Sequence, residues 1–158
     1  MGLQLKAVDL TAAATSTPLF KLGTWYKDEF GRNWQYCKGG GTIAQYEYVK
    51  ISTDGNFSIS SLTTTTNPST EPAEVGCVQC SGFTSSTYGW VFRGGGAHTG
   101  KFAASCVQDV KIYTTGTAGV VDDASTTLVN GLKLLATITS ATSAAAWAAC
   151  ERMTTVAA

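Results

Sequence analysis

Short segments of alternating apolar and polar residues, separated by turn signals roughly every 8–12 residues, dominate this sequence. In residues 20–38, two runs rich in aromatic residues flank a polar tip at 27–32, where Gly31 can take a positive φ. A second pair of runs flanks the turn at 53–56. Nearly half of the residues are Gly, Ala, Ser or Thr, which suits short strands joined by turns. The pattern predicts an all-β fold, either a small β-sandwich or a β-barrel.

The chain is long enough for one domain, and its first part differs from the rest. At 158 residues, a single core buries about 68–70% of the surface of the unfolded chain. Residues 1–19 show no helical stripe, and their apolar residues recur at nearly alternate positions, as in a strand with one buried face. We therefore expect an extended N-terminal arm over 1–19, followed by a single β-rich domain over 20–158. The apolar residues expected to contact a partner are Leu3, Leu5, Val8 and Leu10.

The charge content excludes several classes of partner. Lys and Arg together number 11, as do Asp and Glu, so the formal net charge is zero and only 14% of residues are charged. A protein that binds nucleic acid needs clustered basic residues, which this sequence lacks. The first residues have no apolar core typical of a secretory signal, and no segment approaches the ~20 apolar residues of a membrane span. We expect a soluble protein without a nucleic-acid or membrane partner.

The five cysteines predict buried, reduced thiols better than a disulfide framework, because their number is odd and no secretory signal is evident. Cys77 and Cys80 form a CxxC motif, a spacing that can hold one metal or form a redox pair. Zinc would require two further ligands, and the sequence offers only isolated candidates. We expect no metal and no cofactor, although the sequence leaves open whether this pair is free, bridged or metal-bound.

Catalytic patterns are also missing. His98 is the only histidine, placed in a glycine-rich segment, 94–100, that reads as a loop between strands. No nucleophile elbow or phosphate-binding loop accompanies it. Asp54 and the pair Asp122 and Asp123 lie near turns without a calcium-loop pattern, so we expect them to fix the backbone of those turns. The sequence therefore predicts a protein that is not an enzyme.

The alanine-rich C-terminal region is ambiguous. Alanine favours helices, yet no helical stripe is sustained after residue 139. We expect a loop at 140–146 and a last strand at about 148–156, with a short helix as the alternative.

Two groups of segments resemble the small head proteins of tailed bacteriophages that decorate or cement the capsid. The first group comprises a Tyr-Gly-Trp-Val run and two later strand and turn segments. The second comprises the aromatic hairpin and the glycines after it. The first group covers residues 88–91, 110–123 and 129–132. The second group covers residues 22–24, 28–32 and 34–41.

The resemblance implies a virion structural protein that binds the outside of the major capsid shell. Such a cement protein would be made in the host cytoplasm, would bridge neighbouring capsid subunits as a dimer or trimer, and would need no cofactor. The arm could add a strand to a neighbouring sheet. The aromatic residues expected at interfaces are Trp25, Trp34 and Trp90.

The same tryptophans support an alternative, a phage tail or fibre component or a host-glycan-binding module. A small enzyme that uses His98 with Cys106 or with the CxxC pair is the least favoured hypothesis.

Overall fold

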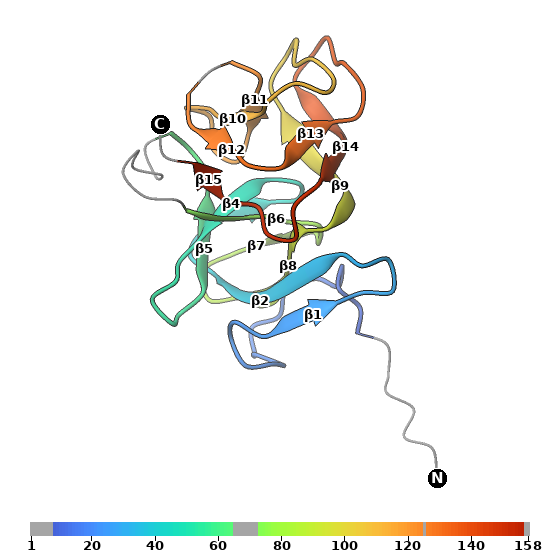
Figure 1. The fold of residues 1–158 in the computed structure, drawn as a ribbon. Helices are drawn as coiled ribbons and strands as arrows, with labels where there is room; N and C mark the ends of the chain where they lie inside the picture. Colours follow the sequence, from blue (N-terminus) through green and yellow to red (C-terminus); the bar gives the residue numbers. More distant parts are fainter. Residues whose placement is uncertain (1–7, 65–72, 125, 157–158) are drawn as a thin grey trace.

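The computed structural model describes residues 8–64, 73–124 and 126–156. Within these ranges every regular element is a β-strand, as Figure 1 shows, and the predicted all-β fold is confirmed. None of these residues belongs to a helix long and apolar enough to cross a membrane.

Five strands close into a barrel. The first and the last strand in the order given below pair with each other and complete the ring. All neighbouring strands in the ring are antiparallel except β2 and β5, which are parallel. A further strand, β1 (Trp25–Lys27), pairs with β2 outside the ring. In order round the ring, the five strands are β2 (Asn33–Gly39), β5 (Ser58–Ser61), β4 (Tyr48–Ile51), β6 (Glu74–Cys77) and β8 (Tyr88–Gly94).

Both hairpins expected from the sequence are present. In the first, β1 and β2 are antiparallel and Tyr26 lies opposite Trp34. In the second, β4 and β5 are antiparallel and Ile51 lies opposite Ile59. Such cross-strand pairs add about 0.2–1 kcal/mol each relative to alanine pairs, which helps to fix the register of both hairpins.

Alternate residues of the five strands point into the barrel and fill it with apolar side chains. The packing is tight at Gly76, where an added Cβ would lie 2.4 Å from Cγ1 of Val91. Any larger residue at position 76 would therefore displace the barrel core. The apolar side chains inside the ring are Cys37, Val49, Ile51, Ile59 and Val91.

A short antiparallel pair, β3 (Ile43–Ala44) and β7 (Gly82–Phe83), covers one end of the barrel, which we call the apolar end. The Phe83 ring is buried against Gly89 of β8, where an added Cβ would lie 3.0 Å from the ring. The other buried side chains of this end are Ile43, Val78 and Cys80.

A second, seven-stranded sheet packs on the outer face of the barrel, above it in Figure 1. The two are joined at residues 94–96, where Gly95 has a φ of +83° and a Cβ on Gly94 would lie 2.3 Å from the carbonyl oxygen of Cys150. In order, the strands are β13 (Leu132–Leu134), β14 (Thr142–Ala148), β9 (Gly96–Phe102), β11 (Val121–Asp122), β10 (Tyr113–Thr114), β12 (Leu128–Val129) and β15 (Thr155–Val156).

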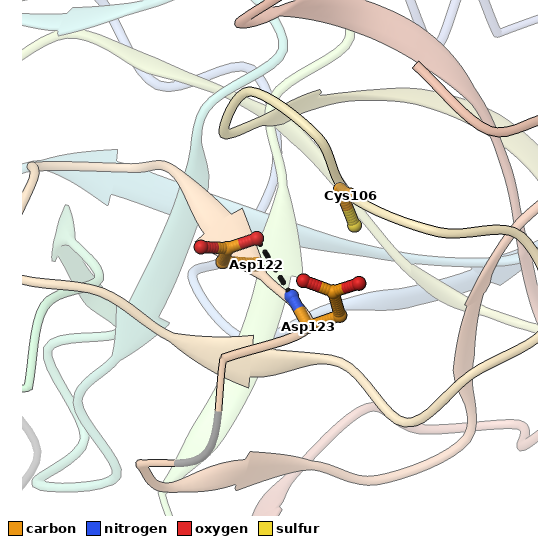
Figure 2. Close-up of side chains that lie close together, drawn as sticks. All are labelled: Cys106, Asp122 and Asp123. Atoms are coloured by element: carbon orange, nitrogen blue, oxygen red, sulfur yellow. Dashed lines mark hydrogen bonds between the residues drawn. The ribbon is translucent and has the colours of Figure 1, made fainter. Parts of the chain in front are cut away.

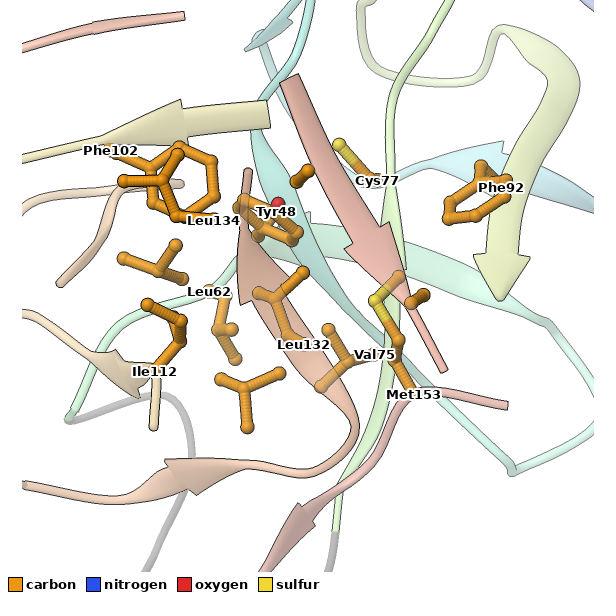
Figure 3. Close-up of a cluster of buried hydrophobic side chains, with 14 of the residues drawn as sticks. Tyr48, Leu62, Val75, Cys77, Phe92, Phe102, Ile112, Leu132, Leu134 and Met153 are labelled. Carbon is orange, nitrogen blue, oxygen red and sulfur yellow. The ribbon is translucent and has the colours of Figure 1, made fainter. Parts of the chain in front are cut away.

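The main hydrophobic core lies between the barrel and this second sheet, as Figure 3 shows. The barrel contributes residues whose side chains point outward from its wall, and the second sheet contributes the opposite side. From the barrel and its flanking loop come Tyr48, Leu62, Val75, Cys77 and Phe92, and from the second sheet and its loops come Phe102, Ile112, Leu132, Leu134 and Met153.

Two loops expected from the sequence are strands instead. Residues 96–102 form β9 and residues 142–148 form β14, and the two pair with each other along their whole length. The expected loops at 94–100 and 140–146 were therefore wrong. Small side chains are weak strand formers, but pairing with a distant segment overrides that local preference.

The N-terminal residues that the structure describes lie against the barrel of the same chain. Thr15 and Tyr88 exchange two backbone hydrogen bonds, of 2.9 and 2.8 Å. Val8 and Leu10 are partly buried against the main core, so part of their apolar surface is used within the chain. The other two predicted contact residues of the arm, Leu3 and Leu5, lie outside the described residues.

Candidate interaction surface

Exposed apolar side chains are concentrated in the first hairpin and the residues before it, and those of Trp25 and Tyr26 lie on opposite faces of β1. Of the ten large hydrophobic residues that are exposed in the described part of the chain, five fall between positions 19 and 30. The most exposed are Phe30 at 72% and Leu19 at 69%. We call the set the hairpin surface, and its members are Leu19, Phe20, Trp25, Tyr26 and Phe30.

Part of the hairpin surface rests on a cluster of aromatic rings. The Phe20 ring centroid lies 5.2 Å from both Tyr36 and Trp90, and that of Tyr26 lies 6.0 Å from Trp90. Beside them is an open, mostly apolar hollow of about 340 Å³. Its lining includes Val8, Leu19, Phe20, Tyr36, Tyr88 and Trp90. The aromatic residues are thus held in place while one side remains accessible.

Two of the three tryptophans predicted at interfaces lie in the core. Trp34 is 2% exposed and Trp90 is 5% exposed, whereas Trp25 is 42% exposed. Trp34 packs edge-on against Phe92 with centroids 5.6 Å apart. The sequence could not distinguish the exposed Trp25 from the buried Trp34 and Trp90. Strands β2 and β8 are covered on both faces, so the alternation of residues along them does not indicate which side chains are exposed.

Asp28 fixes the tip of the hairpin. Its carboxylate accepts hydrogen bonds from the backbone N–H groups of Phe30 and Arg32, at 3.0 and 2.9 Å, and from Nε1 of Trp34 at 3.1 Å. Nε of Arg32 donates to the same carboxylate at 2.7 Å. Burial alone would raise the pKa of Asp28, but these bonds hold it below its usual value. This turn leaves the Phe30 side chain exposed, a site that the sequence did not single out.

His98 is part of the core and not of a surface loop. It lies on β9, is 8% exposed, and stacks on Phe92 with ring centroids 4.4 Å apart. Its Nε2 is 3.0 Å from the hydroxyl oxygen of Tyr48. Burial lowers the pKa of His98 to about 4, so the ring is neutral at neutral pH.

The CxxC pair consists of two buried, free thiols. The Cys77 thiol donates a hydrogen bond to the carbonyl oxygen of Thr99 at 3.3 Å. Burial raises the pKa of both Cys77 and Cys80. Because the thiolate is the reactive and metal-binding form, neither thiol is primed for chemistry.

Cys106, Asp122 and Asp123 form a separate cluster, shown in Figure 2, whose candidate ligand atoms lie within 4.8 Å of one another. One Asp122 oxygen accepts the backbone N–H of Asp123 at 2.8 Å, and one Asp123 oxygen accepts that of Val107 at 2.9 Å. Burial, followed by the two carboxylates, raises the pKa of Cys106 to about 11. The bond to Val107 joins the loop after β9 to the end of β11, in line with the turn-fixing role expected for these aspartates.

No protein-family model, curated protein or solved structure matches this chain. A functional proposal must therefore depend on the residues of this chain and on the physical character of its surface.

Proposed function

We propose that this chain is a non-catalytic structural protein of a virus particle. In this proposal it binds the outside of the major capsid shell as a cement protein, bridges neighbouring subunits and itself forms a dimer or trimer. The observation that carries the proposal is the hairpin surface, with its concentration of exposed aromatic and aliphatic side chains. The sequence resemblance to phage head proteins supplies the kind of partner.

The composition of this surface supports protein binding. Aromatic residues are enriched at interfaces and charged residues are depleted from their centres. Three of the five residues of the hairpin surface are more than 40% exposed, namely Leu19, Trp25 and Phe30. A net charge of zero fits a partner that is recognised by shape and apolar contact more than by long-range attraction.

The environment of the reactive side chains supports a role without catalysis. The only conventional base, His98, is neutral and enclosed by Tyr48 and Phe92. Cys106, its suggested partner in the enzyme hypothesis, is fully buried, and its pKa is raised. Neither group is presented to a substrate.

A sedimentation experiment tests the proposal. The purified chain is mixed with expanded shells of the phage that encodes it, and pelleted protein is quantified. We expect wild-type protein to sediment with the shells and to raise their melting temperature, because binding stabilises the bound state by mass action. Failure of the wild-type chain to sediment would overturn the proposal.

Matched variants locate the contact. Phe30→Asp places a charge on the hairpin surface, and Leu135→Asp places one on an exposed residue outside it, 41% accessible in the wild type. We expect the first variant to lose about tenfold or more in affinity, typical of a central apolar contact, and the second to bind like wild type. Equal binding by both variants would remove the hairpin surface from the proposal.

The alternative, a tail, fibre or host-glycan-binding module, is favoured by one observation, the indole ring of Trp25, which is 42% exposed. Aromatic faces of this kind also bind sugars. A glycan array with the purified chain separates the two functions: specific sugar binding that Trp25→Ala abolishes, without shell binding, would favour the alternative.

A further inference from the structure

The end of the barrel opposite the apolar end is lined by charged and polar side chains, and we call it the charged mouth. Gln35, Glu74 and Arg93 sit on β2, β6 and β8, and alternation directs all three toward the interior of the ring. Arg93 is only 1% exposed. Its Nη1 donates to Oε1 of Gln35 and its Nη2 donates to Oε2 of Glu74.

A second arginine and a tryptophan complete the charged mouth. Arg152, which follows β14, donates from Nη2 to the other oxygen of Glu74. Trp25 of β1 lies close to both cations, with its ring centroid 5.1 Å from Cζ of Arg93 and 5.3 Å from Cζ of Arg152. One partly exposed indole ring therefore contacts two guanidinium groups.

The charges within this group do not balance. Glu74 supplies one negative charge to two arginines, so the group carries a net positive charge beside the low-dielectric barrel interior, where charge interactions are stronger than in water. A guanidinium has five N–H donors. Nε of Arg93 is buried and has no hydrogen-bond partner among the described residues.

These groups surround a small cavity. Its volume is about 130 Å³, room for about four molecules the size of water at ~30 Å³ each. That is enough for one small anion and too little for a sugar or a nucleotide. The cavity is lined by Trp25, Gln35, Ile51, Thr53, Phe57, Glu74, Arg93 and Arg152.

We infer that the charged mouth is a binding site for a small oxyanion, either a carboxylate or a phosphate group. Arginine suits both, because its planar fork of donors matches two oxygens of the same group. The anion offsets the excess positive charge and accepts hydrogen bonds from the donors left over after the contacts to Gln35 and Glu74. This inference concerns the isolated chain and holds whether or not the chain binds a capsid.

Nuclear magnetic resonance tests the inference directly. The uniformly ¹⁵N-labelled full chain is titrated with sodium phosphate and, separately, with sodium acetate, with sodium chloride keeping the ionic strength constant. The reporters are the Nε–H signal of Arg93 and the indole N–H signal of Trp25, the latter assigned with Trp25→Phe. We expect both to shift along one saturable curve for at least one of the two anions.

The internal reference is Trp147, which is 45% exposed on β14 and does not line the cavity. Its indole signal should stay in place. The two titrations also distinguish the sources of the oxyanion: tighter binding of acetate indicates a carboxylate site, and tighter binding of phosphate indicates a phosphate site. Linear shifts, or equal shifts with chloride alone, would overturn the inference.

Two variants separate a site from a general charge effect. Arg152→Gln removes an exposed cation of the charged mouth, so the fold should persist, and we expect the dissociation constant to rise about tenfold or more. Lys133→Gln removes an exposed cation from β13 and should leave binding unchanged. Equal weakening by the two substitutions would show only non-specific attraction and would contradict the site.

Discussion

The two ends of the barrel are built by the same strands and differ in what fills them. At the apolar end, Phe83 packs against backbone and aliphatic neighbours, and no charge has to be compensated. At the charged mouth, Arg93 is equally buried but depends on Gln35 and Glu74 for its hydrogen bonds. Apolar packing stabilises the fold in proportion to the area removed from water. A buried cation costs free energy unless its hydrogen-bond and ion-pair partners compensate for the lost water.

This difference has a functional consequence. The apolar end borders an open hollow of about 380 Å³ whose lining includes Ile43, Gly82 and Phe83, but none of the described residues there has a buried side-chain polar atom without a hydrogen-bond partner. The charged mouth has a cavity and a buried donor, Nε of Arg93, without a hydrogen-bond partner, so a bound ligand can stabilise it. The two ends should therefore respond differently to substitution, salt and pH.

The largest effect is expected from Phe83→Ala at the apolar end. Removing a buried phenyl ring leaves a cavity and should lower the free energy of unfolding by about 3–5 kcal/mol. Urea denaturation at low and high salt measures this, and the loss should be the same at both. Phe30→Ala is the matched control, because Phe30 is 72% exposed and its removal should change stability by less than about 0.5 kcal/mol. A loss below about 1 kcal/mol at position 83 would mean that this end is not closed by packing.

At the charged mouth, we expect Arg93→Met to destabilise by about 3 kcal/mol, since it leaves Gln35 without its donor and Glu74 with Arg152 alone. The double variant Arg93→Met with Glu74→Gln should recover part of the loss, because the partly buried carboxylate is then replaced by a neutral amide. Denaturation of the wild type and the three variants gives the coupling between positions 74 and 93. Strictly additive losses would contradict an ion pair between Arg93 and Glu74.

The pH dependence of stability separates a buried neutral group from the buried charges. The pKa of His98 falls from 6.5 in the unfolded chain to about 4 when folded, so protonation favours the unfolded state. The contribution of His98 to stability should be constant above pH 6.5 and fall by up to about 3 kcal/mol between pH 6.5 and 4. His98→Gln should remove this decline, measured by denaturation across the range.

Glu74 provides the contrast at the charged mouth. Burial opposes its ionisation, but hydrogen bonds and charge from Arg152 and Arg93 hold its pKa below the ordinary 4.5. The stability that ionised Glu74 contributes is therefore present above pH 4.5 and is lost only as the pH falls below that value. A decline above pH 4.5 that survives His98→Gln would show that another group titrates there.

The sequence predicted the features that depend on neighbours in the chain. Both hairpins follow from local alternation and turn chemistry, as the pairing of Tyr26 with Trp34 shows. It did not predict β9 and β14, since Gly96–Phe102 and Thr142–Ala148 form strands by pairing with each other and with β11 and β13, and the two strands are far apart in the chain. Local propensity contains no information about such a partner.

The same limit applies to the two sites. Phe30 lies in a recognisable turn, but its exposure depends on how Asp28 holds that turn. Gln35, Glu74 and Arg93 are far apart in the sequence, and only the closure of the ring by β2 and β8 brings them together. Nothing in the sequence indicates which strands close a barrel, so the charged mouth could not have been anticipated.

Thiol labelling gives the smallest but most local test of the difference between the two ends. Cys80 is buried at the apolar end, whereas Cys150 is the only partly exposed cysteine among the five. In the native protein, Ellman's reagent should label Cys150 first, and Cys150→Ser should remove this fast phase while changing stability by less than about 0.5 kcal/mol. In that background, Phe83→Ala should speed the labelling of Cys80, because opening of the apolar end exposes it. Arg93→Met should speed it less, since it perturbs the opposite end; equal acceleration would mean that the barrel opens as one unit and that its two ends are not energetically distinct.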